Sequence, residues 1–116
     1  MSTKIVNLDY LNDMSDGDRN LILEMIELFI SEVPGYLSLM NEYLNQKNWE
    51  SLGKLAHKAK ASASIMGMND LADDLKKLEH QTREGTNSDE YPDQVQNINN
   101  QFTIATEELK QIAKTL

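Results

Sequence analysis

Length, composition and charge exclude several classes of protein. The chain has 116 residues and no cysteine, which fits one domain and excludes disulfides and thiolate metal sites. With only two histidines, a net charge of −8 and a pI near 4.6, it should bind proteins rather than metals, nucleic acids or anionic membranes.

The sequence contains no pattern typical of a membrane span or of a nucleotide site. No apolar run approaches the roughly 20 residues that a membrane helix needs, and the start Met1-Ser2-Thr3-Lys4 lacks the apolar stretch of a signal peptide. The five glycines form neither of the common phosphate-binding loops. We therefore expect a cytoplasmic protein that has no cofactor of its own and is not an ATP-dependent enzyme.

Hydrophobic residues recur with helical spacing through nearly the whole chain. A short apolar segment, Leu8 to Met14, precedes Ser15-Asp16-Gly17-Asp18, which offers capping side chains for a long helix. That helix has apolar residues at three- and four-residue steps from Ile22 to Leu44 and should end within Asn45 to Asn48. Pro34 lies inside it and should bend it or divide it into two helices.

Two further helices are predicted in the middle of the chain. The first begins at Trp49 and should end at Gly67, because glycine suits a left-handed helix cap. Asn69 or Asp70 can cap the second. The longest polar connection, 85–92, follows it.

The last helix repeats apolar residues at strict three- and four-residue steps from Val95 to Leu116. This pattern suits packing against neighbours in an antiparallel bundle, which we favour, or a self-associating coiled coil. Together the segments predict an all-α fold spanning residues 1–116. We expect a monomeric antiparallel four-helix bundle with a short additional N-terminal helix.

His57 should lie on the face of its helix that points away from the core. At about 100° per residue, it is roughly opposite Leu55 and Ala59. Its own side of the helix consists of small or cationic residues: Gly53, Lys54, Lys60, Ala61 and Ser64. Small neighbours would leave the imidazole accessible to a large partner, and Lys60 could meet an anion delivered to the ring.

This part of the chain is also free of acidic residues. No Asp or Glu occurs from Ser51 to Asn69, while Lys54, Lys58 and Lys60 give the stretch a charge of +3. Because the whole chain carries −8, the remaining residues carry −11. Each feature also has an ordinary explanation, since most exposed histidines are simply solvated and small residues often mark close helix packing. Their coincidence on one face favours a functional site.

Glu79 is a candidate partner of the histidine. It is in phase with Leu71 and Leu75, at the rim of the apolar stripe of the next helix. Because that helix should return antiparallel, the carboxylate can accept the Nδ1 proton of His57 and leave Nε2 free as a nucleophile. Alternatively, Glu79 extends into water. His80 has no comparable setting and should be a surface residue.

The segment from Leu55 to Glu79 resembles the signature of histidine-containing phosphotransfer (HPt) domains, which are four-helix bundles of bacterial phosphorelays. In that family a phospho-accepting histidine is followed by a lysine, small residues, a glycine and a leucine-rich helix that ends in Leu-Glu. The matching positions are His57, Lys60, Ser62, Gly67, Leu71, Leu75, Leu78 and Glu79. Ala61 departs from the usual glycine and leaves slightly less room beside the imidazole.

The resemblance implies a phosphocarrier. His57 would take a phosphoryl group from an aspartyl-phosphate on the receiver domain of a hybrid histidine kinase and pass it to the aspartate of a response regulator. Lys60 would stabilise phosphoryl charge, Glu79 would orient His57, and the receiver would hold Mg²⁺. The surface that binds receivers would include Lys54, Lys58, Ala61, Ser62, Ser64 and Gly67.

A different class of function remains as an alternative. A non-catalytic helical adaptor, including a degenerate HPt domain, could bind a partner through the same helix face as His57. Acyl transfer and hydrolysis are weaker alternatives, because no Ser, His and Asp arrangement and no oxyanion pocket are indicated.

Overall fold

The computed structural model describes residues 6–116, which are almost entirely helical. The elements are α1 (Asp9–Met14), α2 (Arg19–Asn45), α3 (Trp49–Ile65), α4 (Asn69–Glu84), the 3-10 helix η1 (Ser88–Glu90) and α5 (Tyr91–Thr115). No strand occurs among these residues. The predicted all-α fold with a short additional N-terminal helix is confirmed.

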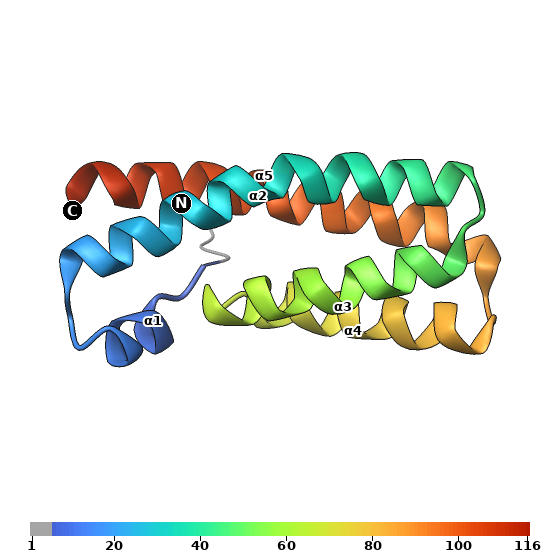
Figure 1. Cartoon of the computed structure of the whole chain (residues 1–116), viewed down its shortest axis with the longest axis horizontal. Helices are drawn as coiled ribbons and strands as arrows, with labels where there is room; N and C mark the ends of the chain where they lie inside the picture. The colour runs from blue at the N-terminus through green and yellow to red at the C-terminus, as the bar shows by residue number, and fades with distance from the viewer. Residues whose placement is uncertain (1–5) are drawn as a thin grey trace.

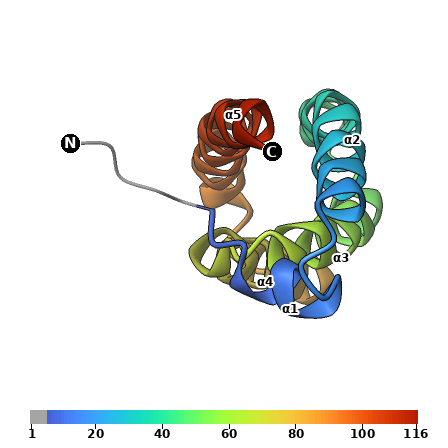
Figure 2. The same cartoon turned by 90° about the vertical axis from the view of Figure 1, so that its left-hand side faces the viewer.

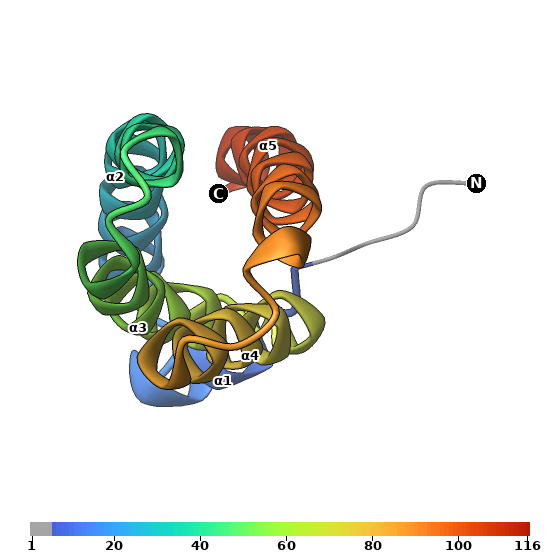
Figure 3. The ribbon, with the colours of Figure 1, turned by 90° about the vertical axis from the view of Figure 1, so that its right-hand side faces the viewer.

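The four long helices form an antiparallel bundle in which successive helices run in opposite directions (Figure 1). Seen along the bundle, α2, α3, α4 and α5 follow one another around its axis, and α5 returns beside α2 (Figure 2 and Figure 3). The short helix α1 lies at the end of the bundle where α3 ends and α4 begins. This arrangement places α3 and α4 side by side.

One apolar core runs through the bundle. Its largest fully buried side chains come from all five α-helices and the link before α4: Leu11, Ile26, Met40, Leu52, Met66, Met68, Leu71, Leu75, Leu78, Tyr91, Ile98 and Phe102. Phe29 and Tyr36 of α2 each contact the ring of Phe102 on α5, with centroids 5.9 Å apart. Burial of each such side chain contributes about 1.5–3 kcal/mol, so these apolar contacts hold the helices together.

α2 passes through Pro34 as one helix, so the alternative of two helices in tandem is wrong. Asp18 caps its start, because the Asp18 carboxylate accepts hydrogen bonds from the backbone N–H groups of Asn20 and Leu21 at 3.0 and 3.3 Å. Figure 1 shows the axis of α2 changing direction near its middle, as expected where proline removes a hydrogen bond. Buried residues on both sides of the proline, including Val33 and Tyr36, keep the two halves in one helix.

The N-terminal cap of α4 differs from the prediction. The helix begins at Asn69, and its cap position is occupied by Met68, so neither Asn69 nor Asp70 caps it. Gly67 turns the chain directly from α3 into α4, and the Met68 N–H donates to the carbonyl of Ala63 at 3.0 Å. Because this tight link lies in the core, its cap position takes an apolar side chain.

The connection between α4 and α5 is also shorter than predicted. Within 85–92, η1 forms a helical turn, and Tyr91 and Pro92 already belong to α5. Tyr91 is buried, and its hydroxyl donates to the carbonyl of Thr86 at 2.6 Å. Its ring packs edge-on against the ring of Trp49, with centroids 4.9 Å apart. Burial of the Tyr91 ring therefore lets α5 begin at Tyr91, inside the segment 85–92 that was predicted to be a loop.

The apolar stripe of α5 packs inside this chain. Val95, Ile98, Phe102, Ala105 and Leu109 are buried, Ile112 is half-buried and Leu116 is 38% exposed. The bundle interpretation of the strict spacing is therefore correct as far as Leu109. The monomeric state stays a prediction.

Gly67 ends α3 in the left-handed conformation, as predicted, with φ of 70°. The N-terminal segment crosses directly over it, because the Asn7 N–H donates to the Met66 carbonyl at 3.0 Å. A Cβ at Gly67 would lie 1.9 Å from the carbonyl oxygen of Asn7. The glycine thus meets two requirements, one of backbone conformation and one of space.

We expect Gly67→Ala to lower the free energy of unfolding much more than Gly85→Ala. Both glycines are left-handed, with φ of 70° and 71°, so each substitution costs about 1–2 kcal/mol of backbone strain. Only at Gly67 must the backbone of Asn7 also move, which adds about 1–3 kcal/mol. Urea unfolding followed by circular dichroism measures the difference. Equal losses in the two variants would contradict the contact with Asn7.

Candidate functional site

α3 presents His57 to solvent beside α4. The imidazole side chain is 66% exposed, whereas Ala56 and Ala59 on the same helix are completely buried. The prediction that His57 faces away from the core is confirmed. Its ring is therefore open to a macromolecular partner.

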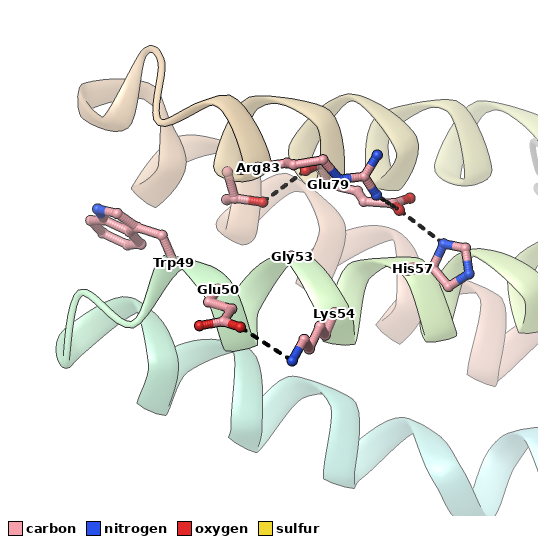
Figure 4. Close-up of a pocket in the computed structure, with 8 residues that line it drawn as sticks. Trp49, Glu50, Gly53, Lys54, His57, Glu79 and Arg83 are labelled. Atoms are coloured by element: carbon pink, nitrogen blue, oxygen red, sulfur yellow. Dashed lines mark hydrogen bonds and ion pairs between the residues drawn. The ribbon is translucent and has the colours of Figure 1, made fainter.

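The carboxylate of Glu79 lies against the imidazole (Figure 4). Oε2 of Glu79 is 2.9 Å from Nδ1 of His57, within hydrogen-bond distance. The Glu79 side chain is only 11% exposed, so the alternative in which it extends into water is wrong. The antiparallel return of α4 beside α3 produces this contact between residues 22 positions apart.

The pKa of the Glu79 carboxyl is lower than its ordinary value. Burial raises this pKa, but the hydrogen bond and the charge of Lys60, together with those of His57, lower it by more. The carboxylate is therefore ionised at neutral pH and can only accept hydrogen bonds. It follows that Nδ1 of His57 is the donor, and in the neutral ring Nε2 keeps its lone pair.

Lys60 contacts the same carboxylate. Its Nζ is 3.2 Å from Oε1 of Glu79, and its side chain is 28% exposed. An ammonium group has three donors, so one contact with Glu79 leaves two for another anion. The prediction that Lys60 stands beside the histidine is compatible with this position, one helical turn after His57 on α3.

Arg83 is a further member of the site that the sequence interpretation missed. Its Nη2 donates to Oε2 of Glu79 at 2.7 Å, from the next turn of α4 (Figure 4). The only available signal was the i,i+4 spacing from Glu79 to Arg83, which is common on exposed helix faces and therefore not specific. Three hydrogen-bond donors, His57, Lys60 and Arg83, thus share the carboxylate of Glu79.

The other predicted binding residues fall into two groups. Those exposed on α3 are Lys54, Lys58, Ala61 and Ser64. Ser62 is half-buried and hydrogen-bonded to the Tyr36 hydroxyl of α2 at 3.0 Å, and Gly67 packs against the N-terminal segment. Ser62 and Gly67 are thus less accessible than the four exposed residues, and their contact with a partner stays a prediction.

A pocket of about 410 Å³ adjoins the histidine between α3 and α4 (Figure 4). It is lined by Trp49, Glu50, Gly53, Lys54, His57, Glu79, Thr82 and Arg83. Gly53, which was expected to keep the imidazole accessible, is instead buried and faces α4. For this residue the alternative of close helix packing is correct.

His80 lies on the surface, as predicted. Its exposed ring pairs through Nε2 with Glu84 on the next turn of the same helix. Within residues 6–116, no cluster of three or more His, Cys, Asp or Glu side chains is arranged to hold a metal ion. No helix of this part of the chain has both the length and the apolar character needed to cross a membrane.

Together these groups form an accessible nucleophile whose neutral ring has one fixed tautomer. Nε2 of His57 has a free lone pair, Nδ1–H is held by Glu79, and Lys60 supplies a nearby positive charge. An imidazole that attacks an electrophile through Nε2 becomes positively charged, and the adjacent carboxylate offsets this charge. The arrangement suits transfer of an anionic group to or from a large partner.

Comparison with solved structures identifies two with the same fold. Histidine-containing phosphotransfer protein B (HptB) from Pseudomonas aeruginosa PAO1 matches with a TM-score of 0.89 and 21% identity, over 99% of each chain. The HPT domain of the Hpt sensor hybrid histidine kinase from Shewanella matches with a TM-score of 0.83 and 17% identity, over 97% of this chain and 96% of that one. At these identities the likeness shows the fold alone.

Sequence comparison extends the likeness to a family. Curated protein sequences include no significant match to the chain. The family model of the Hpt domain matches residues 24–116, which include most of α2 and all of α3, α4 and α5. The chain therefore belongs to the Hpt domain family.

Proposed function

We propose that this domain is a phosphorelay intermediate in which His57 carries the phosphoryl group. It would accept the group from an aspartyl-phosphate of the receiver domain of a hybrid histidine kinase and pass it to the aspartate of a response regulator. Membership in the Hpt family supports a phosphotransfer role in two-component signalling. The observation that carries the proposal is an exposed imidazole whose Nδ1 is held by a buried carboxylate.

In the first transfer, the lone pair of Nε2 attacks the phosphorus of the aspartyl-phosphate. The Nε2–P bond forms while the P–O bond to the aspartyl carboxylate breaks, so the receiver regains a free carboxylate. Nδ1 keeps its proton, and the resulting positive charge on the His57 ring is offset by Glu79 at 2.9 Å. Attack by the aspartate of the second receiver on the same phosphorus returns the ring to its neutral form.

The domain would share the stabilisation of charge with its partner. Mg²⁺ bound by the receiver would neutralise part of the phosphoryl charge, and Lys60 would add one cation from this side. The exposed Lys58 suits a partner whose active site is rich in carboxylates, and Lys54 could exchange its exposed ion pair with Glu50 for one with that partner. A monomeric state and a cytoplasmic location stay predictions.

We expect His57→Gln to abolish acceptance of phosphoryl from a phosphorylated receiver. Helix content and the melting temperature should change little, because the His57 side chain is exposed and Glu79 keeps its contacts with Lys60 and Arg83. Incubation with a labelled receiver, followed by gel separation, measures the transfer. His80→Gln is the matched control, since it removes the other histidine.

The outcomes of this assay separate the relay from the adaptor. Retained phosphorylation of His57→Gln would contradict the assignment of the phospho-accepting residue. A wild-type domain that binds receivers but accepts no phosphoryl group would instead support the non-catalytic adaptor.

Lys60→Ala should slow transfer by about tenfold to a hundredfold. A single electrostatic donor commonly contributes about 1.5–3 kcal/mol to a transition state, and Lys60 would share this task with the metal of the receiver. Single-turnover rates under saturating receiver measure the effect. Lys114→Ala, which removes a lysine near the end of α5, provides the control for loss of one positive charge. Equal rates in the two variants would show that Lys60 does not act on the phosphoryl group.

Glu79→Met should release the imidazole from its single tautomer and slow transfer. Methionine matches the length of glutamate but cannot accept the Nδ1 proton at Oε2. Imidazole ¹⁵N chemical shifts at a pH of about 8.5, where ordinary imidazoles are neutral, distinguish the two tautomers. Glu84→Met is the control, because it removes the carboxylate that pairs with His80. An unchanged His57 tautomer in Glu79→Met would refute this role of Glu79.

A further inference from the structure

α3 and α4 pack closely against each other beside the candidate site, at Gly53. This glycine is buried and faces Thr82 of α4. A Cβ at Gly53 would lie 2.5 Å from Oγ1 of Thr82 and 3.7 Å from the backbone carbonyl oxygen of Glu79. The first distance is far below the separation of about 3.5 Å at which nonbonded heavy atoms attract each other. Only glycine permits this approach of the two helices.

Thr82 cannot easily move out of the way. Its hydroxyl donates to backbone carbonyls of its own helix, at 2.9 Å from both Leu78 O and Glu79 O. The side chain is buried, and its β-branch restricts it to few rotamers. Rotation would leave a buried hydroxyl without its acceptors, which is costly. A methyl group at position 53 would therefore push α3 and α4 apart.

This close approach lies one helical turn from the His57–Glu79 hydrogen bond. Gly53 precedes His57 by four residues on α3, and Thr82 follows Glu79 by three residues on α4. Because the helices are antiparallel, the two pairs are consecutive contacts along one interface. Figure 4 shows Gly53 and His57 on adjacent turns of α3, both beside α4.

The hydrogen bond is sensitive to the separation of the two helices. Nδ1 of His57 is 2.9 Å from Oε2 of Glu79, and N–H···O bonds in proteins usually span about 2.7–3.2 Å. Glu79 belongs to α4, and Arg83 of the same helix also holds Oε2 at 2.7 Å, so separating the helices would stretch the contacts of the carboxylate with His57 and Lys60 of α3. A displacement of the helices by about 1 Å would break the contact.

We infer that Gly53 is a positioning residue for phosphoryl transfer. Because Gly53 has no side chain, α3 and α4 can pack closely enough for Glu79 to hold the Nδ1 proton of His57. The inference rests on the proposed function and adds to it the feature of the fold that orients the nucleophile.

The first test compares Gly53→Ala with wild type. We expect the ¹⁵N shifts of His57, at a pH of about 8.5, to change from one dominant Nδ1–H tautomer to a mixture. The rate of transfer from a phosphorylated receiver should fall about tenfold to a hundredfold, because a reacting group misplaced by about 1 Å can cost up to about a hundredfold in rate. Gly35→Ala is the matched control, because Gly35 also lies inside a helix but has open space around its Cα. It should leave both measurements unchanged.

The second test asks whether space at Thr82 restores the site. In Gly53→Ala/Thr82→Ala the nearest side-chain atom to the new Cβ is the Cβ of residue 82, at 3.5 Å, which is an ordinary contact. The double variant should regain the single tautomer and most of the transfer rate. If Gly53→Ala alone does not fold, recovery of folding and of the His57 tautomer in the double variant carries the test.

Three outcomes are distinguishable. A wild-type tautomer and rate in Gly53→Ala would overturn the inference, as would a folded double variant in which His57 remains a mixture of tautomers. If the tautomer responds as expected but no protein, wild type included, accepts a phosphoryl group, Gly53 orients His57 and the proposed function fails instead.

Discussion

The candidate site depends on the burial of one carboxylate. Glu79 is only 11% exposed, and an ionised group at that depth needs donors from its surroundings. Two come from α3, His57 and Lys60, and one comes from α4, Arg83. Because these donors keep the carboxylate charged, it can only accept, and this decides that His57 carries its proton on Nδ1. One buried charge thus determines which nitrogen of the neutral ring keeps its lone pair.

The bundle also brings a carboxylate of α4 beneath the lysine-bearing surface of α3. The segment from Ser51 to Asn69 contains no acidic residue, and the three lysines of α3 outnumber its one acidic residue, Glu50, which pairs with Lys54 at 3.3 Å. Tertiary packing brings Glu79 under this surface from α4. A receiver would therefore meet cations at the surface, while the carboxylate that orients the nucleophile lies below and is paired with its own donors.

Helical spacing was sufficient to predict the fold, because a period of 3.6 residues is a local property that any amphipathic helix must satisfy. Polar caps and turn residues predicted helix ends less well. α4 begins after Met68, and α5 begins at Tyr91, and both of these side chains are completely buried. In each case burial of an apolar or aromatic group in the core outweighed the preference of nearby polar residues for a cap or turn.

The sequence by itself determined that His57 is exposed and that Glu79 lies at the rim of an apolar stripe, because the phase of a helix follows from backbone geometry alone. Whether Glu79 meets the imidazole or water was decided only by the tertiary structure. So were the participation of Arg83 and the packing of Gly53 and Ser62 against neighbouring helices. The physical reason is that residue spacing specifies positions along one helix, whereas these contacts depend on the distance and register between two.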